Sequence, residues 1–260
     1  MRSRRIVRDT VRRWLMLQQD LGGDEVILPL LGEPAADPGR VTGAPAGETG
    51  GWRKGAPPIP GPGMSVTSQL VIGTPQWQSL DEIAAVVREC PKCPLCRTRT
   101  HAVPGEGNPH AGMLLVGEGP GESEDLSGRP FVGRAGELLD KMLAAIGIPR
   151  ADAYIANVVK CRPPKNRVPL PDEREACMPY LRRQIELVQP RVLVALGGTA
   201  AETLLGVKMS LGQLRLKVHQ WNGIPLIVTY HPAALLRNPN WKRPAWDDVR
   251  IARQLLDRDA

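Results

Sequence analysis

Four short apolar runs constrain the fold of this 260-residue chain more than any other feature. They are Met113 to Val116, Tyr154 to Val159, Arg191 to Leu196, and Leu226 to Val228. Each run is bounded by turn residues and has the length of a buried strand, and helical patterns separate the runs. Strands that alternate with helices imply right-handed crossovers. The sequence therefore predicts an α/β fold, a three-layer α/β/α sandwich with a central, mostly parallel, four-stranded sheet.

The spacing of apolar residues also predicts where the helices lie. A capping box at Ser79 to Glu82 begins a helix that ends near Cys90. The other expected helices span about 135–146, 171–188, 199–205 and 246–256. Ligands of such folds bind at the carboxyl ends of the strands. We therefore expect the site in the loops that follow Val116, Val159, Leu196 and Val228.

The first 78 residues have a different character from the rest. Apolar positions between Arg4 and Leu21 predict a basic amphipathic helix, which could dock on the main domain or contact DNA or a partner. The composition from Gly32 to Gly63 is rich in Pro and Gly, which is typical of a linker. The expected organisation is a helix and linker over residues 1–78, dispensable for chemistry, followed by a domain over residues 79–260.

The charge of the chain indicates the kind of partner. A formal net charge of +7 and a pI near 9.4 favour a polyanion, and nucleic acid is the leading candidate. The sequence has no apolar run of the roughly 18 to 20 residues that a membrane helix needs. Arg4-Arg5 resembles an export signal only superficially, because charged residues interrupt the segment that follows. We expect a cytoplasmic protein with no membrane partner.

Five cysteines are too few for a secreted disulfide scaffold of this length, and their spacing suggests a metal site. Cys90 and Cys93 form a CxxC, and Cys161 and Cys177 lie far downstream. Spacing alone accepts a structural zinc or an iron-sulfur cluster. Cys96 makes a second CxxC with Cys93, so spacing does not exclude it as a ligand.

The loop after the first expected strand is rich in glycine. Residues Gly117 to Asp125 read GEGPGESED, and glycines there let backbone amides approach a ligand closely. The pattern is neither a Walker motif nor GxGxxG. Phe131, the only phenylalanine of the chain, follows among Gly, Pro and Arg. That context favours stacking on a flat ring over filling a core.

Two polar residues lie at the end of, or shortly after, other expected strands. Asn157 offers both a donor and an acceptor, so it could read the imide edge of a pyrimidine such as uracil and reject cytosine, although a turn or capping role is the alternative. His231 follows the last strand beside apolar and basic residues and could face DNA.

Several motifs, taken together and in order, resemble the family 4 uracil-DNA glycosylases over about Glu89 to Leu256. They are the CxxC, GEGNP at 105–109, VGEGPGESED, GRPFVGRAG, YIANVVKCRPPKNRVPLP, and HPAALLRNP at 231–239. The resemblance implies a monofunctional hydrolase that releases uracil from single- or double-stranded DNA. We expect it to act as a monomer.

The resemblance also implies roles for individual residues. A [4Fe-4S] cluster would be held by Cys90, Cys93, Cys161 and Cys177, with Cys96 outside. Phe131 would stack on the base, Asn157 would read it, and Leu235 would be the wedge that fills the gap of a flipped base. The catalytic candidates are Glu118, Glu124, Asn166 and His231. Further substrate contacts are expected from Gly117, Gly119 and Arg237.

Hydrolysis of the glycosidic bond places negative charge on uracil, so we expect the amides of Gly117 to Gly121 and His231 to donate to it. Asn166 and Glu124 are the candidates for positioning water. Two alternatives stay open: a non-catalytic iron-sulfur DNA-binding module, and a superfamily glycosylase with broader substrates such as hypoxanthine. The segment 214–217 departs from the family, with Leu where relatives tend to have Arg-Gly.

Overall fold

A computed structural model describes residues 50–67 and 77–258 of the chain. Its centre is one seven-stranded sheet in the order β1-β6-β7-β5-β3-β4-β2. The four inner strands β7, β5, β3 and β4 run parallel to one another. The strands are β1 (Pro62–Val66), β2 (Glu106–Gly107), β3 (Met113–Gly117), β4 (Ala153–Asn157), β5 (Val192–Leu196), β6 (Val218–Trp221) and β7 (Ile224–Thr229).

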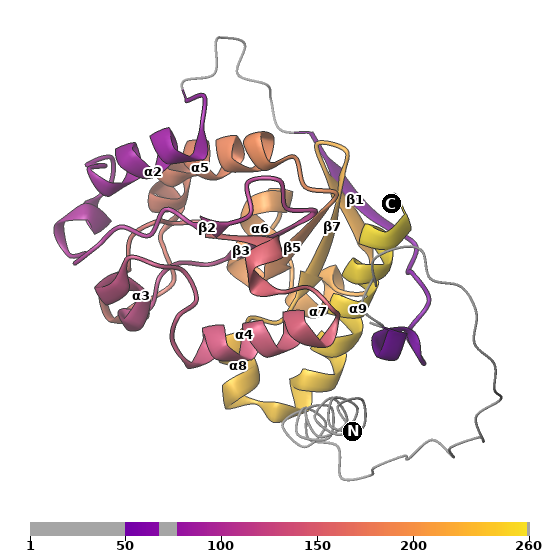
Figure 1. Cartoon of the computed structure of the whole chain (residues 1–260). Helices are drawn as coiled ribbons and strands as arrows, with labels where there is room; N and C mark the ends of the chain where they lie inside the picture. The colour runs from indigo at the N-terminus through magenta and orange to yellow at the C-terminus, as the bar shows by residue number, and fades with distance from the viewer. Residues whose placement is uncertain (1–49, 68–76, 259–260) are drawn as a thin grey trace, which may run out of the picture.

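Helices cover both faces of the sheet, as Figure 1 shows. One layer holds α2 (Leu80–Arg88), α5 (Pro171–Val188), α6 (Gly198–Leu205) and α7 (Leu211–Leu214), and the other holds α4 (Arg134–Ala145), α8 (Pro232–Arg237) and α9 (Lys242–Arg258). The short helix α3 (Glu122–Ser127) follows β3. Single turns of 3-10 helix are η1 (Gly50–Arg53), η2 (Pro94–Arg97), η3 (Arg150–Asp152), η4 (Pro164–Asn166) and η5 (Pro239–Trp241).

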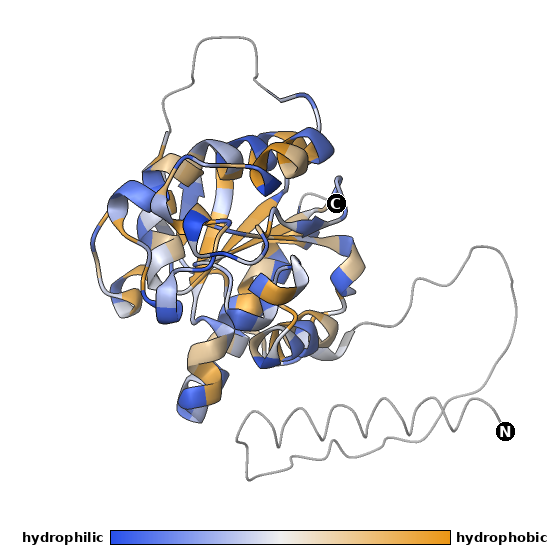
Figure 2. Cartoon of the chain, turned by 90° about the vertical axis from the view of Figure 1, so that its left-hand side faces the viewer, coloured by the Kyte–Doolittle hydropathy of each residue, from blue (hydrophilic) through white to orange (hydrophobic). Residues whose placement is uncertain are grey.

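The inner strands are apolar on both sides because both sides are covered. Leu114 and Val116 of β3 point into the core under α5 and α6, whereas Met113 and Leu115 point into the core under α4 and α9. This is the reason why these strands are continuous apolar runs. In Figure 2 the strands form a hydrophobic band between helices whose outer faces are polar.

The predicted α/β/α architecture and the mostly parallel sheet are confirmed, but the sheet has seven strands instead of four. The four predicted runs are the inner strands. The three additional strands lie toward the edges: β2 has two residues and pairs antiparallel with β4, and β6 pairs antiparallel with β7. Such short, partly polar strands carry no apolar run that sequence patterning could detect.

Residues 50–66, which the sequence assigns to the linker, pack on the domain. Trp52 is 4 % exposed, and Arg250 of α9 donates to its carbonyl oxygen at 2.9 Å. The strand β1 pairs in parallel with β6 at the sheet edge. The predicted basic helix between Arg4 and Leu21 lies outside the described residues. Within the described ranges, none of the helices is long and apolar enough to cross a membrane.

Candidate active site

The carboxyl ends of β3 and β4 bring Gly117 and Asn157 side by side, since the two residues are partners in the parallel register. A Cβ atom at Gly117 would lie 2.7 Å from Cζ of Phe131 and closer still to Oδ1 of Asn157. Only glycine allows this approach of an aromatic ring and an amide to one backbone position. The ring of Phe131 also stacks on that of His231, with centroids 5.4 Å apart. We call Gly117, Phe131, Asn157 and His231 the strand-end cluster.

Asn157 has the best-buried side chain of the strand-end cluster. It is 1 % exposed, and its Oδ1 has no hydrogen-bond partner among the described residues. A buried amide oxygen without a partner is costly, so such atoms usually mark the place of a ligand or water. The backbone carbonyl of Asn157 accepts a hydrogen bond from Nζ of Lys160 at 2.9 Å. Lys160 therefore holds the backbone of Asn157, while the side-chain oxygen of Asn157 is left without a partner among the described residues.

Phe131 is held in an unusual backbone conformation. Its φ is +51°, in the left-handed region that non-glycine residues rarely adopt, and the residue is 6 % exposed. Arg150 donates to the carbonyl oxygens of Pro130 at 2.6 Å and Phe131 at 3.2 Å. A Cβ at Gly136 would overlap the Phe131 carbonyl, so glycine is required there for α4 to approach the loop. Strain of this kind is typical of functional loops.

Glu124 organises this loop from the other side. Its Oε1 accepts from the amides of Val132 at 2.9 Å and Gly133 at 3.0 Å, and its Oε2 accepts from Gly121 at 3.1 Å. The carboxylate thus joins the glycine-rich loop after β3 to the loop that carries Phe131. This contact supports a positioning role for Glu124.

His231 is the N-cap residue of α8. Its Nδ1 accepts a hydrogen bond from the amide of Ala233 at 3.1 Å, so a neutral ring carries its proton on Nε2. Burial and, to a smaller extent, the positive charge of Arg237 lower the pKa of His231 to about 4, with Glu124 acting in the opposite direction. The ring is therefore a neutral donor over the physiological pH range.

The other predicted residues have partners outside the strand-end cluster. Oε2 of Glu118 accepts from Oγ1 of Thr199 at 2.5 Å, which ties the end of β3 to the start of α6. Gly119 packs against Val159, whose Cγ2 would lie 2.7 Å from an added Cβ. Asn166 is exposed and accepts from Nε of Arg162 at 2.8 Å, and no described contact joins it to the strand-end cluster.

The helix α8 presents one leucine inward and another outward. Leu235 is 1 % exposed and packs in the core with α4. Leu236 is 38 % exposed, and Arg237 at the end of the helix is exposed as well. A wedge must reach solvent to enter DNA, which the structure allows for Leu236 and not for Leu235.

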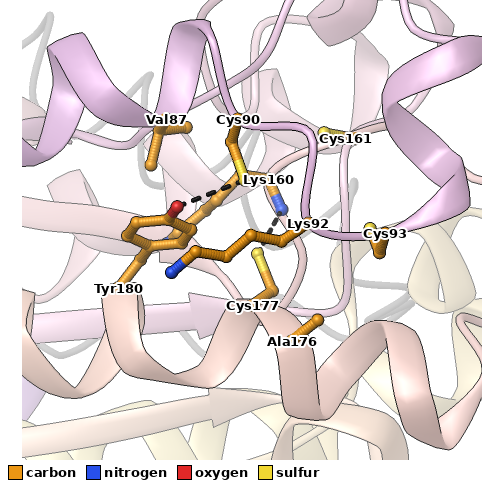
Figure 3. Close-up of a pocket in the computed structure, with 9 residues that line it drawn as sticks. All are labelled: Val87, Cys90, Lys92, Cys93, Lys160, Cys161, Ala176, Cys177 and Tyr180. Carbon is orange, nitrogen blue, oxygen red and sulfur yellow. Dashed lines mark hydrogen bonds between the residues drawn. The ribbon is translucent and has the colours of Figure 1, made fainter.

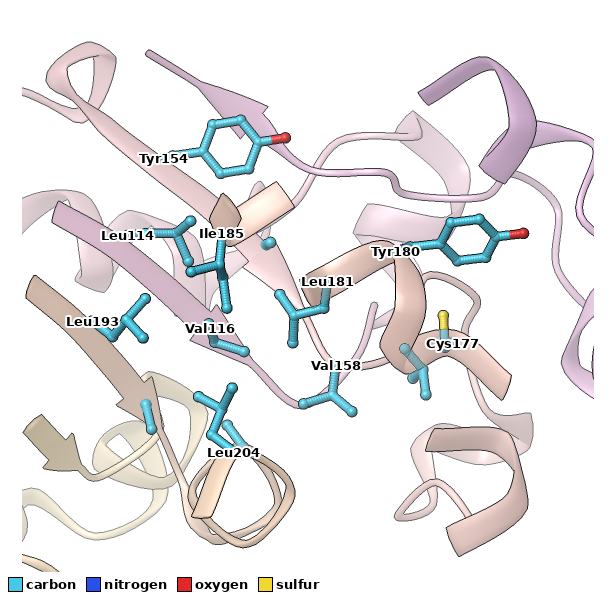
Figure 4. Packing of buried hydrophobic residues seen from close by; sticks show 14 of the residues in the cluster. Leu114, Val116, Tyr154, Val158, Cys177, Tyr180, Leu181, Ile185, Leu193 and Leu204 are labelled. Atoms are coloured by element: carbon cyan, nitrogen blue, oxygen red, sulfur yellow. The ribbon is translucent and has the colours of Figure 1, made fainter. Parts of the chain in front are cut away.

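The four predicted ligand cysteines line one cavity, shown in Figure 3. Cys90 and Cys93 come from the segment after α2, Cys161 follows β4, and Cys177 projects from α5, beside the apolar cluster of Figure 4. Cys96 does not line this cavity. The sequence prediction thus identified a set of thiols that the fold brings together.

Hydrogen-bond donors approach three of the four sulfurs. Arg99 donates to Sγ of Cys161 at 3.0 Å, the hydroxyl of Tyr180 to Cys90 at 3.2 Å, and the amide of Lys160 to Cys177 at 3.3 Å. Burial raises the pKa of Cys177 to about 12 and also raises that of Cys161. Thiolates at these positions need a strongly positive partner, such as a metal centre.

The four cysteines of this cavity form a donor set that fits an iron-sulfur cluster. Within residues 50–67 and 77–258, no group of three or more Cys, His, Asp or Glu side chains is arranged to hold one metal ion. In a [4Fe-4S] cluster the four cysteines bind separate irons, so the sulfurs surround the group without meeting at one point. The described donors therefore fit such a cluster.

Three contributors to this region were not singled out by the sequence: Arg150, Thr199 and Lys160. Arg150 and Thr199 act through partners that are distant in the chain, and no local pattern marks them. Lys160 carried a weak signal, because it is a charge that directly follows the apolar run ending at Val159. Its side chain is 1 % exposed and also donates to Gln184 at 2.6 Å.

Comparison with known proteins agrees with this geometry. The family model described as the Uracil DNA glycosylase superfamily matches residues 104–250. The chain is 46 % identical over 187 residues to a type-4 uracil-DNA glycosylase of Saccharolobus solfataricus, covering 68 % of this chain and 87 % of that protein. A type-4 uracil-DNA glycosylase of Thermotoga maritima is 45 % identical over 184 residues, covering 69 % and 96 %. A type-5 uracil-DNA glycosylase of Thermus thermophilus is 36 % identical over 149 residues, covering 50 % and 68 %.

Proposed function

The chain belongs to the uracil DNA glycosylase superfamily and, within it, to the type-4 enzymes, and we propose that its strand-end cluster hydrolyses the N-glycosidic bond of deoxyuridine in DNA. The products are free uracil and an abasic site, the first step of base excision repair. The observation that carries this proposal is the buried, unpartnered Oδ1 of Asn157 beside the ring of Phe131.

Asn157 distinguishes uracil from cytosine. Its Oδ1 accepts from N3–H of uracil and its Nδ2 donates to O4, whereas cytosine presents an acceptor and a donor in these places. The ring of Phe131 stacks on the flipped base. Lys160 holds the backbone of Asn157, so the amide does not have to be ordered when the base arrives.

His231 stabilises the leaving group. As the bond between N1 and C1′ breaks, its electron pair moves onto uracil, and charge collects on N1 and O2. A neutral His231 donates from Nε2 to this charge, and the backbone amides of Gly117 and Gly119 add further donors. One preorganised donor of this kind is worth about 3 kcal/mol of barrier.

The sugar cation is captured by water. We assign the positioning of this water to Glu118, because it follows Gly117 directly and its carboxylate is held through Oε2 by Oγ1 of Thr199. Asn166 and Glu124 stay weaker candidates, since Asn166 is joined to Arg162 and both oxygens of Glu124 already accept backbone amides. The water oxygen bonds to C1′, and its proton ends on the uracil anion.

DNA reaches the site along α8. Leu236, in place of the buried Leu235, fills the gap left by the flipped base, and Arg237 contacts a phosphate. We propose that single strands and duplexes both bind, and that the protein acts as a monomer. Uracil opposite guanine should be flipped at lower cost than uracil in a good pair.

Cys90, Cys93, Cys161 and Cys177 hold a [4Fe-4S] cluster in this proposal. The group would join α2, the segment after β4, and α5, which hydrogen bonds of Lys160 and Tyr180 also connect. Its contribution here is structural, and the residues of the strand-end cluster perform the chemistry.

The decisive experiment incubates the full chain with an oligonucleotide that contains one deoxyuridine and measures free uracil. We expect release of uracil and an alkali-labile strand, and no release from matched oligonucleotides with cytosine or hypoxanthine. Retention of the oligonucleotide without release would indicate a non-catalytic binding module. Equal release of hypoxanthine would indicate a glycosylase of broader substrate range.

A further inference from the structure

We infer that Trp241 forms a stacking subsite for an unpaired base next to the flipped uracil in a single strand, an inference that rests on the proposed function. Trp241 ends η5, between α8 and α9, and is 39 % exposed. Its ring stacks on that of Tyr230, with centroids 4.8 Å apart and planes 12° apart. Tyr230 immediately precedes His231 of the strand-end cluster. The indole of Trp241 is therefore connected to this cluster through the ring of Tyr230.

Arg215 holds the stack of Tyr230 and Trp241 in place. The guanidinium of Arg215 lies 4.5 Å from the centroid of the Tyr230 ring. Arg215 is itself 8 % exposed and is held by Asp248 at 2.7 and 3.0 Å and by the carbonyl of Pro244 at 2.8 Å. A rigid aromatic surface loses little conformational entropy when a base stacks on it, and it therefore binds more tightly than a mobile one.

The charges around Trp241 select a nucleic acid as its partner. Arg237 and Arg243 are exposed, Lys242 is half-buried, and no salt bridge of these three residues occurs within the described part of the chain. The neighbouring carboxylates of Asp247 and Asp248 are paired with Arg250 and Arg215. An open aromatic ring among unpaired cations is the combination that binds single strands, because every base has a face to stack and every nucleotide has a phosphate.

The position of α8 sets which base is bound. His231 caps the start of α8, and η5 follows its end after Asn238. The helix has six residues, which corresponds to a length of about 9 Å. A strand that delivers uracil to His231 and passes along α8 therefore brings a base from a nearby nucleotide to Trp241. Leu236, exposed on the same helix, lies between the two sites in the chain.

The test measures binding of a single-stranded oligonucleotide that carries 2′-fluorodeoxyuridine, which resists cleavage. Trp241→Ala should raise the dissociation constant about tenfold, and Trp241→Phe, which keeps a stacking ring, less than about threefold. The single-turnover rate of uracil release at saturating enzyme should stay within about twofold of the wild type, because Trp241 does not touch the reacting atoms. Val86→Ala is the matched control, since Val86 is equally exposed at 39 % but lies on α2.

A second arm replaces the base of each nucleotide near the uracil, one at a time, by an abasic spacer. At one position the abasic spacer should lower the affinity of the wild type about tenfold. The same spacer should not lower the affinity of Trp241→Ala, because that variant already lacks the stacking partner of the missing base. Three outcomes would overturn the subsite. The first is that the affinity losses from Trp241→Ala and from the abasic spacer add at every position. The others are that Trp241→Phe binds as weakly as Trp241→Ala, or that Trp241→Ala keeps the affinity and the melting temperature of the wild type. A wild type that releases no uracil would overturn the proposed function instead.

Discussion

A buried lysine holds the backbone of Asn157, the residue that we propose to read the base. Lys160 is 1 % exposed, and its Nζ donates to the carbonyl of Asn157 at 2.9 Å and to Oε1 of Gln184 at 2.6 Å. Gln184 in turn donates to the carbonyl of Pro104 at 2.7 Å. Burial lowers the pKa of Lys160 to about 8. This chain of hydrogen bonds places the end of β4 at a defined distance from α5, and Asn157 with it.

Asn157→Asp should weaken uracil removal, because a carboxylate replaces the donor that faces O4 with an acceptor. Loss of a buried hydrogen bond of this kind costs about 1 to 3 kcal/mol, so kcat/KM for uracil should fall roughly 5- to 150-fold. A protonated carboxyl could also admit cytosine. The check is kcat/KM on matched uracil and cytosine oligonucleotides. An unchanged value for uracil would remove Asn157 from the site.

The pH dependence of the reaction should follow His231. Because its pKa is lowered to about 4, kcat/KM should be constant from about pH 8 to about pH 5 and should fall only near pH 4. Arg237→Gln removes a charge that lowers this pKa, so the acid limb should move to higher pH. A wild-type acid limb near the ordinary histidine pKa would contradict this assignment.

The same residue affects stability. The unfolded chain binds a proton at His231 below about pH 6.5, whereas the folded chain does so only near pH 4, so the free energy of unfolding decreases as the pH falls through this window.

The members of the strand-end cluster could be predicted because each one stands at a strand end or in a short motif. Asn157 ends β4, His231 follows β7 by two residues, and the context of Phe131 predicts a stacking residue. The inward orientation of Leu235 could not be predicted, since the four residues after Pro232 are all apolar. Only the packing of α8 on α4 decides which leucine is buried.

The connection between α7 and β6 contains a strained leucine. Leu216 has a φ of +59° and is 59 % exposed. Leu216→Gly should stabilise the protein by about 0.5 to 1 kcal/mol, because glycine adopts this conformation without a Cβ clash, although it loses more entropy on folding. The measurement is the urea midpoint of unfolding. Leu216→Ala, which shortens the side chain but keeps the clash, is the control and should show no gain.

The cysteine cavity joins elements that are distant in the chain, and substitutions there should separate ligands from bystanders. Cys161→Ser should lower the iron content and the melting temperature, whereas Cys96→Ser should leave both unchanged, because Cys96 does not line the cavity. Iron analysis and visible absorbance of protein purified without air provide the measurement. Loss of iron in Cys96→Ser, or zinc without iron in the wild type, would contradict the assignment.

Patterning identified the inner strands and long helices for a physical reason. A strand covered on both faces must be apolar at every position, as in β5, where all five residues are buried. An edge strand has no such requirement: β1 reads PGMSV and pairs through its backbone. Its place in the sheet comes from contacts with residues more than 150 positions away, which local sequence does not encode.

Residues 50–66 complete the fold although they precede the predicted domain. Met64 of β1 donates its amide to Nδ1 of His219 at 3.0 Å, and the other nitrogen of that ring contacts the carbonyl of Leu214 at 2.7 Å. Gln254 donates to the carbonyl of Pro57 at 3.0 Å. The segment therefore covers the edge of β6 and one end of α9 at the same time.

Two shortened chains should consequently behave differently. A chain that begins at Gly50 keeps Trp52 and β1, and it should melt close to the full chain and release uracil from a single strand at a similar rate. A chain that begins at Trp77 loses the burial of Trp52, worth about 3 to 5 kcal/mol, and exposes the β6 edge, so its melting temperature should fall by many degrees. Since the strand-end cluster and the four cavity cysteines are all retained, activity should persist where this shorter chain is folded.

Equal melting of the two chains would show that residues 50–66 add little stability. Loss of uracil release by the chain beginning at Gly50 would instead assign a direct role to residues 1–49.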